Sequence, residues 1–357
     1  MRSLFFLLSL LAFLSCTFTS DKKIKHSFYY WKTSFPIDSN SVILNNKLNI
    51  DHFYIHYFDV EWNPYLYMPV PVAEITGYQN SVPFINKDFT PVIFITNKCF
   101  ESMPDQWCDS LAYKIRNKII SLSWKMEENY KGTLLVGNSY DTALRNKVMN
   151  EIQIDCDWTA TTREKYFRFL KTFKRLFPGK KISVTIRLYP YKYADKMGVP
   201  PVDKGMLMCY NLTDIKNERT ANSVFDINDL KKYLRAKPYP LPLDVALPVF
   251  GWYAWFGGTK FKGIIYTDDK TGIKDNDPSF KKAGTNFTVL ADTMIGDNFL
   301  RQGDLLRMEY PSPADLETAA KLLHDKFPGI ERIALYYYDN TLINRYEKTI
   351  QNIYALY

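Results

Sequence analysis

Short runs of aromatic and β-branched residues alternate along the chain with segments in which apolar residues recur every three or four positions. The short runs are typical of β-strands, and the longer segments are typical of helices that bury one face. Eight strands are predicted in this way, over residues 26–33, 53–60, 92–96, 152–158, 182–189, 206–211, 245–250 and 333–338. Helices are expected between them, over 104–129, after Thr161, over 228–235 and after Ser312. This alternation predicts an α/β protein with a parallel sheet.

The number and spacing of the strands fit a closed (β/α)8 TIM barrel better than an open sheet, although periodicity alone does not choose between them. The connection between the seventh and eighth strands is much longer than one helix requires. Part of it is rich in Gly, Asp, Lys and Thr and contains strand-like pieces. We therefore expect a barrel domain over 26–357 with a small β-rich insertion at about 255–307.

The amino-terminal residues carry the pattern of an export signal. Met1-Arg2 supplies a positive charge and precedes an apolar run over 4–14. This run is too short to span a bilayer, which takes about 20 residues, but it fits the apolar core of a secretory signal. It ends at Ser15-Cys16, and a small residue followed by cysteine at this border resembles a bacterial lipoprotein signal.

The lipoprotein interpretation predicts removal of a signal peptide over 1–15 and lipidation of Cys16, followed by a linker over 16–25. The alternatives are an ordinary signal peptide, or a buried apolar terminus with a chance cysteine. No later apolar stretch is long enough to cross a membrane. We therefore expect a protein of the cell envelope that is anchored to a membrane through lipid, on the periplasmic side or at the outer-membrane surface.

Composition narrows the classes of partner. The net charge of +8 is spread thinly, without a block of like charges, so we expect no binding of nucleic acid. Aromatic residues make up 16% of the chain, and flat aromatic rings line sugar-binding sites as well as cores. Four His residues and no Cys/His pair at ligand spacing predict neither a metal nor a cofactor. Cys99 and Cys108 are close enough in sequence to form a disulfide in an oxidising compartment. We expect a monomer.

Two carboxylates mark the end of the fourth predicted strand, in Ile154-Asp155-Cys156-Asp157-Trp158. Because side chains alternate along a strand, Asp155 and Asp157 share one face, which we expect to be the barrel interior. Active sites of TIM barrels lie at the carboxyl ends of the strands. Two carboxylates close together in such a site raise each other's pKa. The alternative is one buried structural aspartate with an exposed neighbour.

Other strand ends carry side chains suited to contact with a sugar. They are expected to gather at one end of the barrel, because parallel strands direct their carboxyl ends the same way. The predicted substrate contacts are Trp31, Glu61, Trp62, Trp158, Arg187, Tyr189, Tyr210, Asn211, Trp252 and Tyr337.

Three motifs resemble glycoside hydrolase family 18, the chitinases and related endoglycosidases. The fourth strand resembles that family's D-x-x-D-x-D-x-E pattern, Met208-Cys209-Tyr210-Asn211 resembles its Met-x-Tyr-Asp, and the segment over 247–251 is similar to its G-L-P-x-Y-G. The chain also resembles an uncharacterised group of bacterial barrels with an IQIDxD-type fourth strand. The resemblance implies a barrel that binds or cleaves glycans.

The sequence departs from the family pattern at the catalytic acid. The resemblance implies that a Glu two residues after the last Asp protonates the leaving oxygen, and that position is Thr159 here. A threonine hydroxyl has no useful pKa for this role. The acid could instead come from Glu309 or Glu61, and we take Asp157 with Glu309 as the preferred pair.

Three hypotheses for function follow. The first is a lipid-anchored glycosidase-like enzyme that hydrolyses an oligosaccharide or cell-wall glycan by carboxylate acid/base chemistry. The second is a non-catalytic glycan-binding lipoprotein with a degenerate chitinase-like site. The third is a structural envelope lipoprotein.

Overall fold

A computed structural model of the chain describes residues 23–35, 40–134, 150–234, 237–266, 272–274 and 277–357. The predicted signal peptide, the lipidation site Cys16 and most of the linker over 16–25 lie outside these residues. No helix in the described part of the chain is long and apolar enough to cross a membrane.

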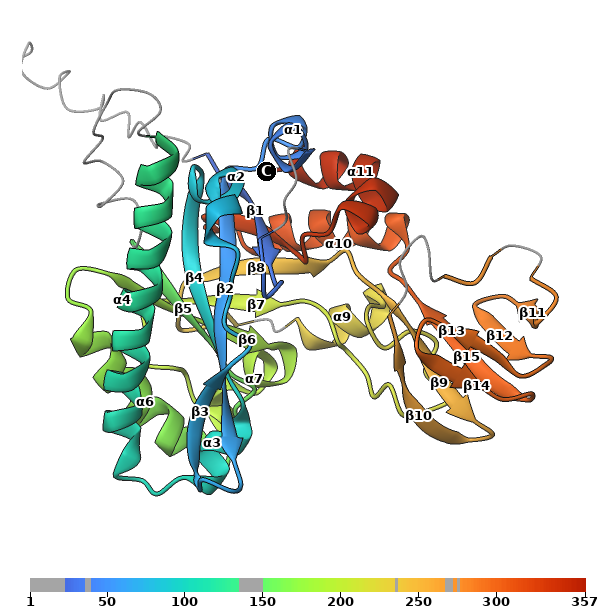
Figure 1. Cartoon of the computed structure of the whole chain (residues 1–357), viewed down its shortest axis with the longest axis horizontal. Coiled ribbons are helices and arrows are strands. Elements are labelled where there is room, and N and C mark those ends of the chain that lie inside the picture. Colours follow the sequence, from blue (N-terminus) through green and yellow to red (C-terminus); the bar gives the residue numbers. More distant parts are fainter. Residues whose placement is uncertain (1–22, 36–39, 135–149, 235–236, 267–271, 275–276) are drawn as a thin grey trace, which may run out of the picture.

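Parallel strands of the described residues close into a barrel, which confirms the predicted (β/α)8 fold (Figure 1). Their order is β1-β16-β8-β7-β6-β5-β4-β2, and β1 pairs with both β16 and β2, so the sheet has no free edge within the ring. The strands are β1 (Lys25–Tyr30), β2 (His52–Asn63), β4 (Asp88–Ile95), β5 (Glu151–Asp155), β6 (Lys181–Arg187), β7 (Lys204–Met208), β8 (Leu243–Pro248) and β16 (Arg332–Tyr336). Each overlaps one of the eight strands predicted from the sequence.

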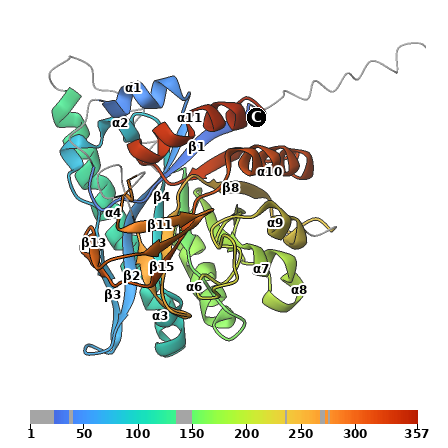
Figure 2. The same cartoon turned by 90° about the vertical axis from the view of Figure 1, so that its right-hand side faces the viewer.

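Helices cover the outside of the barrel (Figures 1 and 2). They are α1 (Asn40–Lys47), α2 (Val82–Ile85), α3 (Asn97–Ser102), α4 (Trp107–Leu134), α6 (Arg163–Leu176), α7 (Leu188–Lys192), α8 (Ala194–Met197), α9 (Ile227–Tyr233), α10 (Pro313–Lys326) and α11 (Asn340–Tyr354), with the 3₁₀ turn η1 (Tyr78–Asn80). The apolar stripe of α6 packs inward, where Tyr166, Phe169 and Phe173 are fully buried. The side chain of Ser312 accepts a hydrogen bond from the backbone N–H of Asp315, so it caps α10 as its sequence indicates.

The long connection after β8 forms a separate antiparallel sheet beside the barrel (Figure 1). Its strands are β9 (Trp252–Gly257), β10 (Lys260–Ile265), β11 (Phe280–Ala283), β12 (Asn286–Val289) and β15 (Asp304–Glu309), with the hairpin β13 (Thr293–Ile295) and β14 (Asn298–Leu300). A small apolar cluster that includes Phe287 and Leu306 supports this sheet. The insertion therefore begins and ends slightly beyond the predicted 255–307.

Charged groups fill the amino end of the barrel interior. Lys204 forms an ion pair with Asp244 at 2.5 Å and another with Glu331 at 2.9 Å. Arg332 forms an ion pair with Glu151 at 2.5 Å. Pairing offsets much of the cost of burying these charges, whereas removal of one partner would leave the other unpaired. The packed amino end leaves the carboxyl ends of the strands, which we call the barrel mouth, as the place for a site.

The structure contains free thiols where a disulfide was one possibility. Cys99 and Cys108 are both buried and unbonded. The Cys99 thiol lies 3.4 Å from the carbonyl oxygen of Val60 and donates to it. These cysteines therefore pack as small apolar side chains.

Candidate functional site

Asp155 is the last residue of β5 and faces the barrel interior. Its side chain accepts a hydrogen bond of 2.5 Å from the hydroxyl of Thr185 on the neighbouring strand β6. Asp155 is only 7% exposed. Burial, followed by the nearby charge of Asp157, raises the pKa of Asp155 to about 7. The Asp155 carboxyl is therefore present in both its protonated and its ionised form near neutral pH.

Asp157 lies two residues further along and has a different environment. Its side chain is 52% exposed and forms an ion pair with Arg187, whose Nε lies 3.1 Å from the carboxylate. Arg187 also donates a hydrogen bond of 2.8 Å to the carbonyl oxygen of Trp158, which fixes its position. The charge of Asp157 contributes to the raised pKa of Asp155, but only Asp157 is open to solvent.

A third carboxylate, Asp59 on β2, was missed by the sequence analysis. Its charge raises the pKa of Asp155 further, which places it near the pair at the mouth. A β-bulge lies between His56 and Phe58. As a result, Tyr57 and Phe58 both face α4: the hydroxyl of Tyr57 lies 3.2 Å from Ser123, and Lys118 lies over the Phe58 ring. Regular alternation would place Asp59 outside, and the bulge turns it inward.

His56 holds Asp59 in this position. Its Nε2 lies 2.6 Å from a carboxylate oxygen of Asp59. The imidazole is buried and packs against the Trp31 ring at 4.8 Å between ring centres. Trp31 in turn contacts Tyr336 at 5.6 Å. The predicted contact Trp31 is thus part of the mouth, together with a His–Asp pair that motif comparison does not reveal.

Aromatic rings form another side of the mouth. Tyr210 stacks on Tyr336 with 5.2 Å between ring centres, and Phe250 meets Tyr210 edge-on at 5.7 Å. Burial raises the pKa of Tyr210 well above its usual value, and the charges of Tyr336, Asp155 and Asp157 add to this. Tyr210 therefore lies beside both aspartates as an un-ionised phenol, in the position that its motif predicted.

Glu309 is not available as a catalytic acid. It is fully buried, and its carboxylate accepts hydrogen bonds from Arg307 Nε at 2.6 Å, from the Ser223 backbone N–H at 3.0 Å and from Trp252 Nε1 at 3.0 Å. Its oxygens are thus occupied inside the junction between the barrel and the insertion. The prediction that Glu309 supplies the acid with Asp157 is contradicted by this burial. Trp252, a predicted substrate contact, uses its indole N–H in the same junction.

Trp158 is a core residue. Its ring is fully buried and stacks on Tyr166 of α6 at 5.4 Å between centres. Continued alternation along the strand places it between the barrel wall and the helices. The prediction of Trp158 as a substrate contact is therefore wrong. Thr159, which follows it, is partly exposed, and its hydroxyl lies 2.9 Å from that of Thr161.

Glu61 and Trp62 lie where β2 extends beyond the ring. Glu61 is exposed, whereas Trp62 is half-buried and packs against the core. Burial and, to a smaller extent, the charge of Glu61 raise the pKa of the Cys99 thiol to about 11. Glu61 is thus oriented toward the α3 side of the barrel, and its role as an acid stays a prediction.

The remaining predicted contacts lie after strand ends. Tyr189 is exposed on α7 beside Tyr193. Asn211 is exposed and has a left-handed backbone with φ of 54°. Tyr337 is half-buried, and burial raises its pKa to about 12. Their contact with a ligand stays a prediction. Within the described residues, no group of three His, Cys, Asp or Glu side chains could hold a metal ion.

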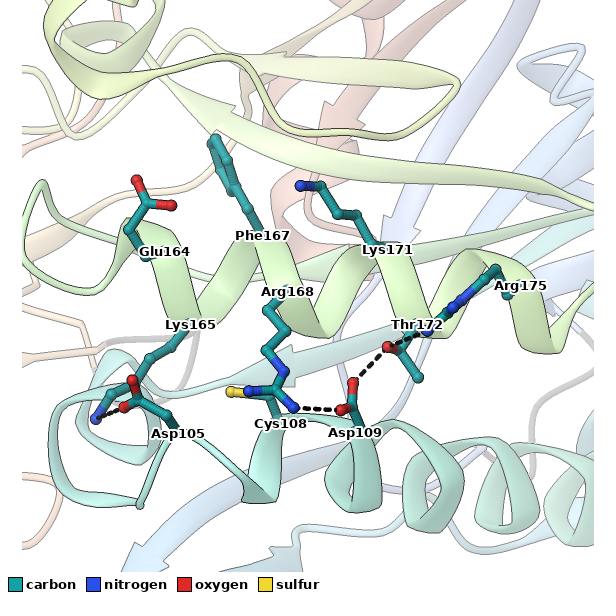
Figure 3. A pocket seen from close by; sticks show the side chains of 10 residues that line it. All are labelled: Asp105, Cys108, Asp109, Glu164, Lys165, Phe167, Arg168, Lys171, Thr172 and Arg175. Carbon is teal, nitrogen blue, oxygen red and sulfur yellow. Dashed lines mark hydrogen bonds and ion pairs between the residues drawn. The ribbon is translucent and has the colours of Figure 1, made fainter.

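A separate hollow of about 660 Å³ lies on the outside of the barrel between α4 and α6 (Figure 3). Its side chains bind one another across the gap: Arg168 forms an ion pair with Asp109 at 2.6 Å, and Lys165 forms one with Asp105 at 3.4 Å. Thr172 also donates a hydrogen bond of 2.5 Å to Asp109. These contacts join two helices and involve none of the residues of the mouth.

Comparison with known proteins extends the description of the fold. No family model matches the chain, and no curated protein matches it in sequence. Among solved structures, the spore cortex-lytic enzyme SleL of Bacillus megaterium QM B1551 is similar at a TM-score of 0.50 and 12% identity, over 93% of this chain and 73% of that one.

SleL of Bacillus cereus has a TM-score of 0.49 at 15% identity, over 92% of this chain and 74% of that one. A chitinase from Chromobacterium violaceum ATCC 12472 has a TM-score of 0.49 at 11% identity, over 92% and 99% of the two chains. At such identities the likeness concerns the fold alone. The chain shares the (β/α)8 barrel fold with SleL of Bacillus megaterium.

Proposed function

We propose that this protein binds a glycan at the barrel mouth and hydrolyses it by carboxylate chemistry, with Asp155 as the group that donates and recovers the proton and Asp157 as the anion that stabilises positive charge. One observation carries the proposal: the pKa of Asp155 is raised to about 7 beside an exposed Asp157 that is paired with Arg187. Two carboxyls whose environments differ in this way can take the roles of proton donor and anion at the same pH. The resemblance of three motifs to glycoside hydrolase family 18 supports the same substrate class.

The proposed reaction assigns one task to each group. Protonated Asp155 donates its proton to the leaving glycosidic oxygen as the bond to the anomeric carbon breaks. Asp157 stabilises the positive charge that develops on the sugar. Water then adds to the anomeric carbon and returns a proton to Asp155. Thr185 positions the Asp155 carboxyl, and Arg187 positions that of Asp157.

Non-catalytic glycan binding is the second candidate. It is favoured by Thr159 at the position where the resemblance implies the acid, and by the locked carboxylate of Glu309. In that case the aromatic rings of the mouth and Asp157 contact the sugar, but no proton reaches the glycosidic oxygen.

A paired measurement separates the two candidates. Wild type, Asp155→Asn and Asp157→Asn are compared for binding on a glycan array and for hydrolysis of the glycans bound. Asp109→Asn is the matched control, because Asp109 also accepts from a threonine hydroxyl and pairs with an arginine, but lies outside the barrel. The hydrolase proposal expects a loss of about 10²-fold or more in rate for the two mouth variants alone. If wild type binds glycans without hydrolysing them, the second candidate is established. If wild type neither binds nor hydrolyses any glycan, both candidates are refuted.

We also propose that the chain is exported and anchored through a lipid on Cys16, as a monomer in the cell envelope. The signal-like pattern of 1–15 supports this proposal. Metabolic labelling with an alkyne fatty acid should mark wild type but not Cys16→Ser, and the unlabelled variant should leave the membrane fraction. Equal labelling of both would disprove lipidation at this residue.

A further inference from the structure

Three consecutive apolar side chains are exposed at the tip of one hairpin. The hairpin joins β2 to the antiparallel strand β3 (Met68–Val72), which lies outside the ring. Tyr65 is 90% exposed, Leu66 is 62% exposed and Tyr67 is 72% exposed. Runs of three or more consecutive exposed apolar residues oppose solubility and often mark a contact site. This hairpin tip, residues Tyr65, Leu66 and Tyr67, therefore has the composition of a contact site.

The turn is built to present these side chains. The Asn63 side chain accepts hydrogen bonds of 2.9 Å from the backbone N–H groups of both Tyr65 and Leu66. Tyr67 has a left-handed backbone with φ of 50°, a region where glycine or asparagine is usual. A tyrosine there carries a conformational cost, and such strain gathers at functional positions.

The chemistry of the hairpin narrows the class of partner. Residues 62–73 contain no charged side chain, although 24% of the whole chain is charged. A charged partner thus finds no complementary group in this segment. The edge strand β3 carries Pro69 and Pro71, which lack the backbone N–H that a strand added from another protein would need. The hairpin therefore favours a neutral ligand that contacts the faces of its aromatic rings.

The position of the hairpin tip relates it to the mouth. Tyr65 lies in the turn six residues beyond Asp59, a distance of at most about 20 Å at 3.3 Å per residue. The hairpin projects past the carboxyl ends of the barrel strands, at the bottom of Figure 1. The described chain enters the barrel at the opposite end, where β1 begins at Lys25. Under the proposed anchoring through Cys16, the chain therefore leaves the barrel for the membrane at the end opposite the hairpin tip.

We infer that the hairpin tip is a second glycan-contacting site, which holds a neutral polymeric glycan at a distance from the mouth by stacking sugar rings on Tyr65 and Tyr67. The inference rests on the proposed function in one respect, namely that the polymer is the glycan whose other part enters the mouth. It narrows the substrate class from short oligosaccharides to long chains. Tyrosine suits this contact because its ring is apolar and its hydroxyl can bond to a sugar or to water.

The test is co-sedimentation of the full chain with insoluble chitin, cellulose, xylan and purified peptidoglycan sacculi. All proteins carry Cys16→Ser so that no acyl chain contributes. The hairpin-tip variant is Tyr65→Ala/Tyr67→Ala, and the matched control is Tyr113→Ala/Trp124→Ala, which removes two exposed rings from α4. The tip variant should bind the retained polymer about tenfold more weakly than wild type, since it loses two ring contacts. Control and wild type should bind equally, and Tyr65→Trp/Tyr67→Trp should retain binding.

Several results would overturn the inference. Equal retention of the tip variant and wild type would do so, as would the absence of wild-type binding to all four polymers. Neutral phosphatidylcholine vesicles are included, and a tip variant that loses vesicle flotation while it keeps polymer binding would assign the tip to lipid instead. Failure of the proposed function has a different result. In that case wild type cleaves no glycan, and Asp155→Asn and Asp157→Asn bind sugars as wild type does.

Discussion

Replacement of Asp155 by asparagine should stabilise the protein while it abolishes hydrolysis. Asp155 is 7% exposed, and its pKa rises from the ordinary 3.8 to about 7 in the folded protein. The folded state therefore binds a proton more tightly than the unfolded state between these values. Stability falls as the pH rises through this window, because the folded protein must then carry a buried carboxylate. Asparagine keeps an oxygen that can accept from Thr185 but carries no charge.

The size of the effect follows from the shift. About three pKa units at 1.36 kcal/mol each give at most about 4 kcal/mol of unfolding free energy regained at pH 8. The gain should shrink to under about 1 kcal/mol near pH 4, where the carboxyl is protonated in the folded state and about half protonated in the unfolded state. Urea unfolding followed by tryptophan fluorescence at pH 4, 6 and 8 measures the difference in unfolding free energy between the two proteins. The dependence of unfolding free energy on urea concentration must be equal for both proteins.

Asp109→Asn is the control and should show the opposite sign. Hydrogen bonds from Arg168 and Thr172 lower the pKa of Asp109, so its charge stabilises the folded state at neutral pH and this contribution is lost as the pH falls. The exposed pair contributes under about 1 kcal/mol. If Asp155→Asn changes stability equally at pH 4 and pH 8, or lowers it at pH 8, the reasoning from burial is refuted.

Three further outcomes are expected. Thr159→Glu should raise the rate of glycan hydrolysis, but by less than the roughly 10²-fold that a sole general acid supplies, because Asp155 already donates a proton; unchanged initial rates would show that this position does not reach the scissile bond. Glu309→Gln should lower the unfolding free energy by about 3–5 kcal/mol in urea titrations, because Arg307 would remain buried without a counter-charge, and wild-type stability would contradict the buried ion pair. Trp158→Ala should lower the unfolding free energy by about 3–5 kcal/mol through the cavity it leaves beside α6, while the folded fraction keeps wild-type glycan affinity. A loss of glycan affinity without a loss of stability would show that Trp158 contacts the ligand.

Local pattern was sufficient to predict the eight strands, most of the long helices and the central pair of aspartates. Alternation along a strand depends only on the backbone, so the shared face of Asp155 and Asp157 could be predicted without knowledge of their neighbours. Parallel strands also end at one side of a sheet, which placed Tyr210 and Arg187 beside them. Polar residues at these strand ends were the feature of the sequence that indicated the site.

The failures concern residues whose surroundings come from distant segments. Glu309 resembles an exposed strand residue in sequence, but Arg307 and Ser223 enclose it where the insertion meets the barrel. Trp158 follows an active-site motif, but α6 covers it. Burial of a side chain depends on what packs over it, and this is not a property of its own segment.

The sequence by itself determined the alternation of strands and helices and the end at which the polar groups gather, because these depend on hydrophobic period and chain direction. Closure of the sheet was decided by the tertiary structure, in which β1 pairs with both β2 and β16. Only the tertiary structure decided that Asp155 is buried while Asp157 is exposed, because their depths depend on where β5 ends relative to its neighbours. It also decided that Asp59 faces the mouth, because a single bulge in β2 shifts the alternation by one residue.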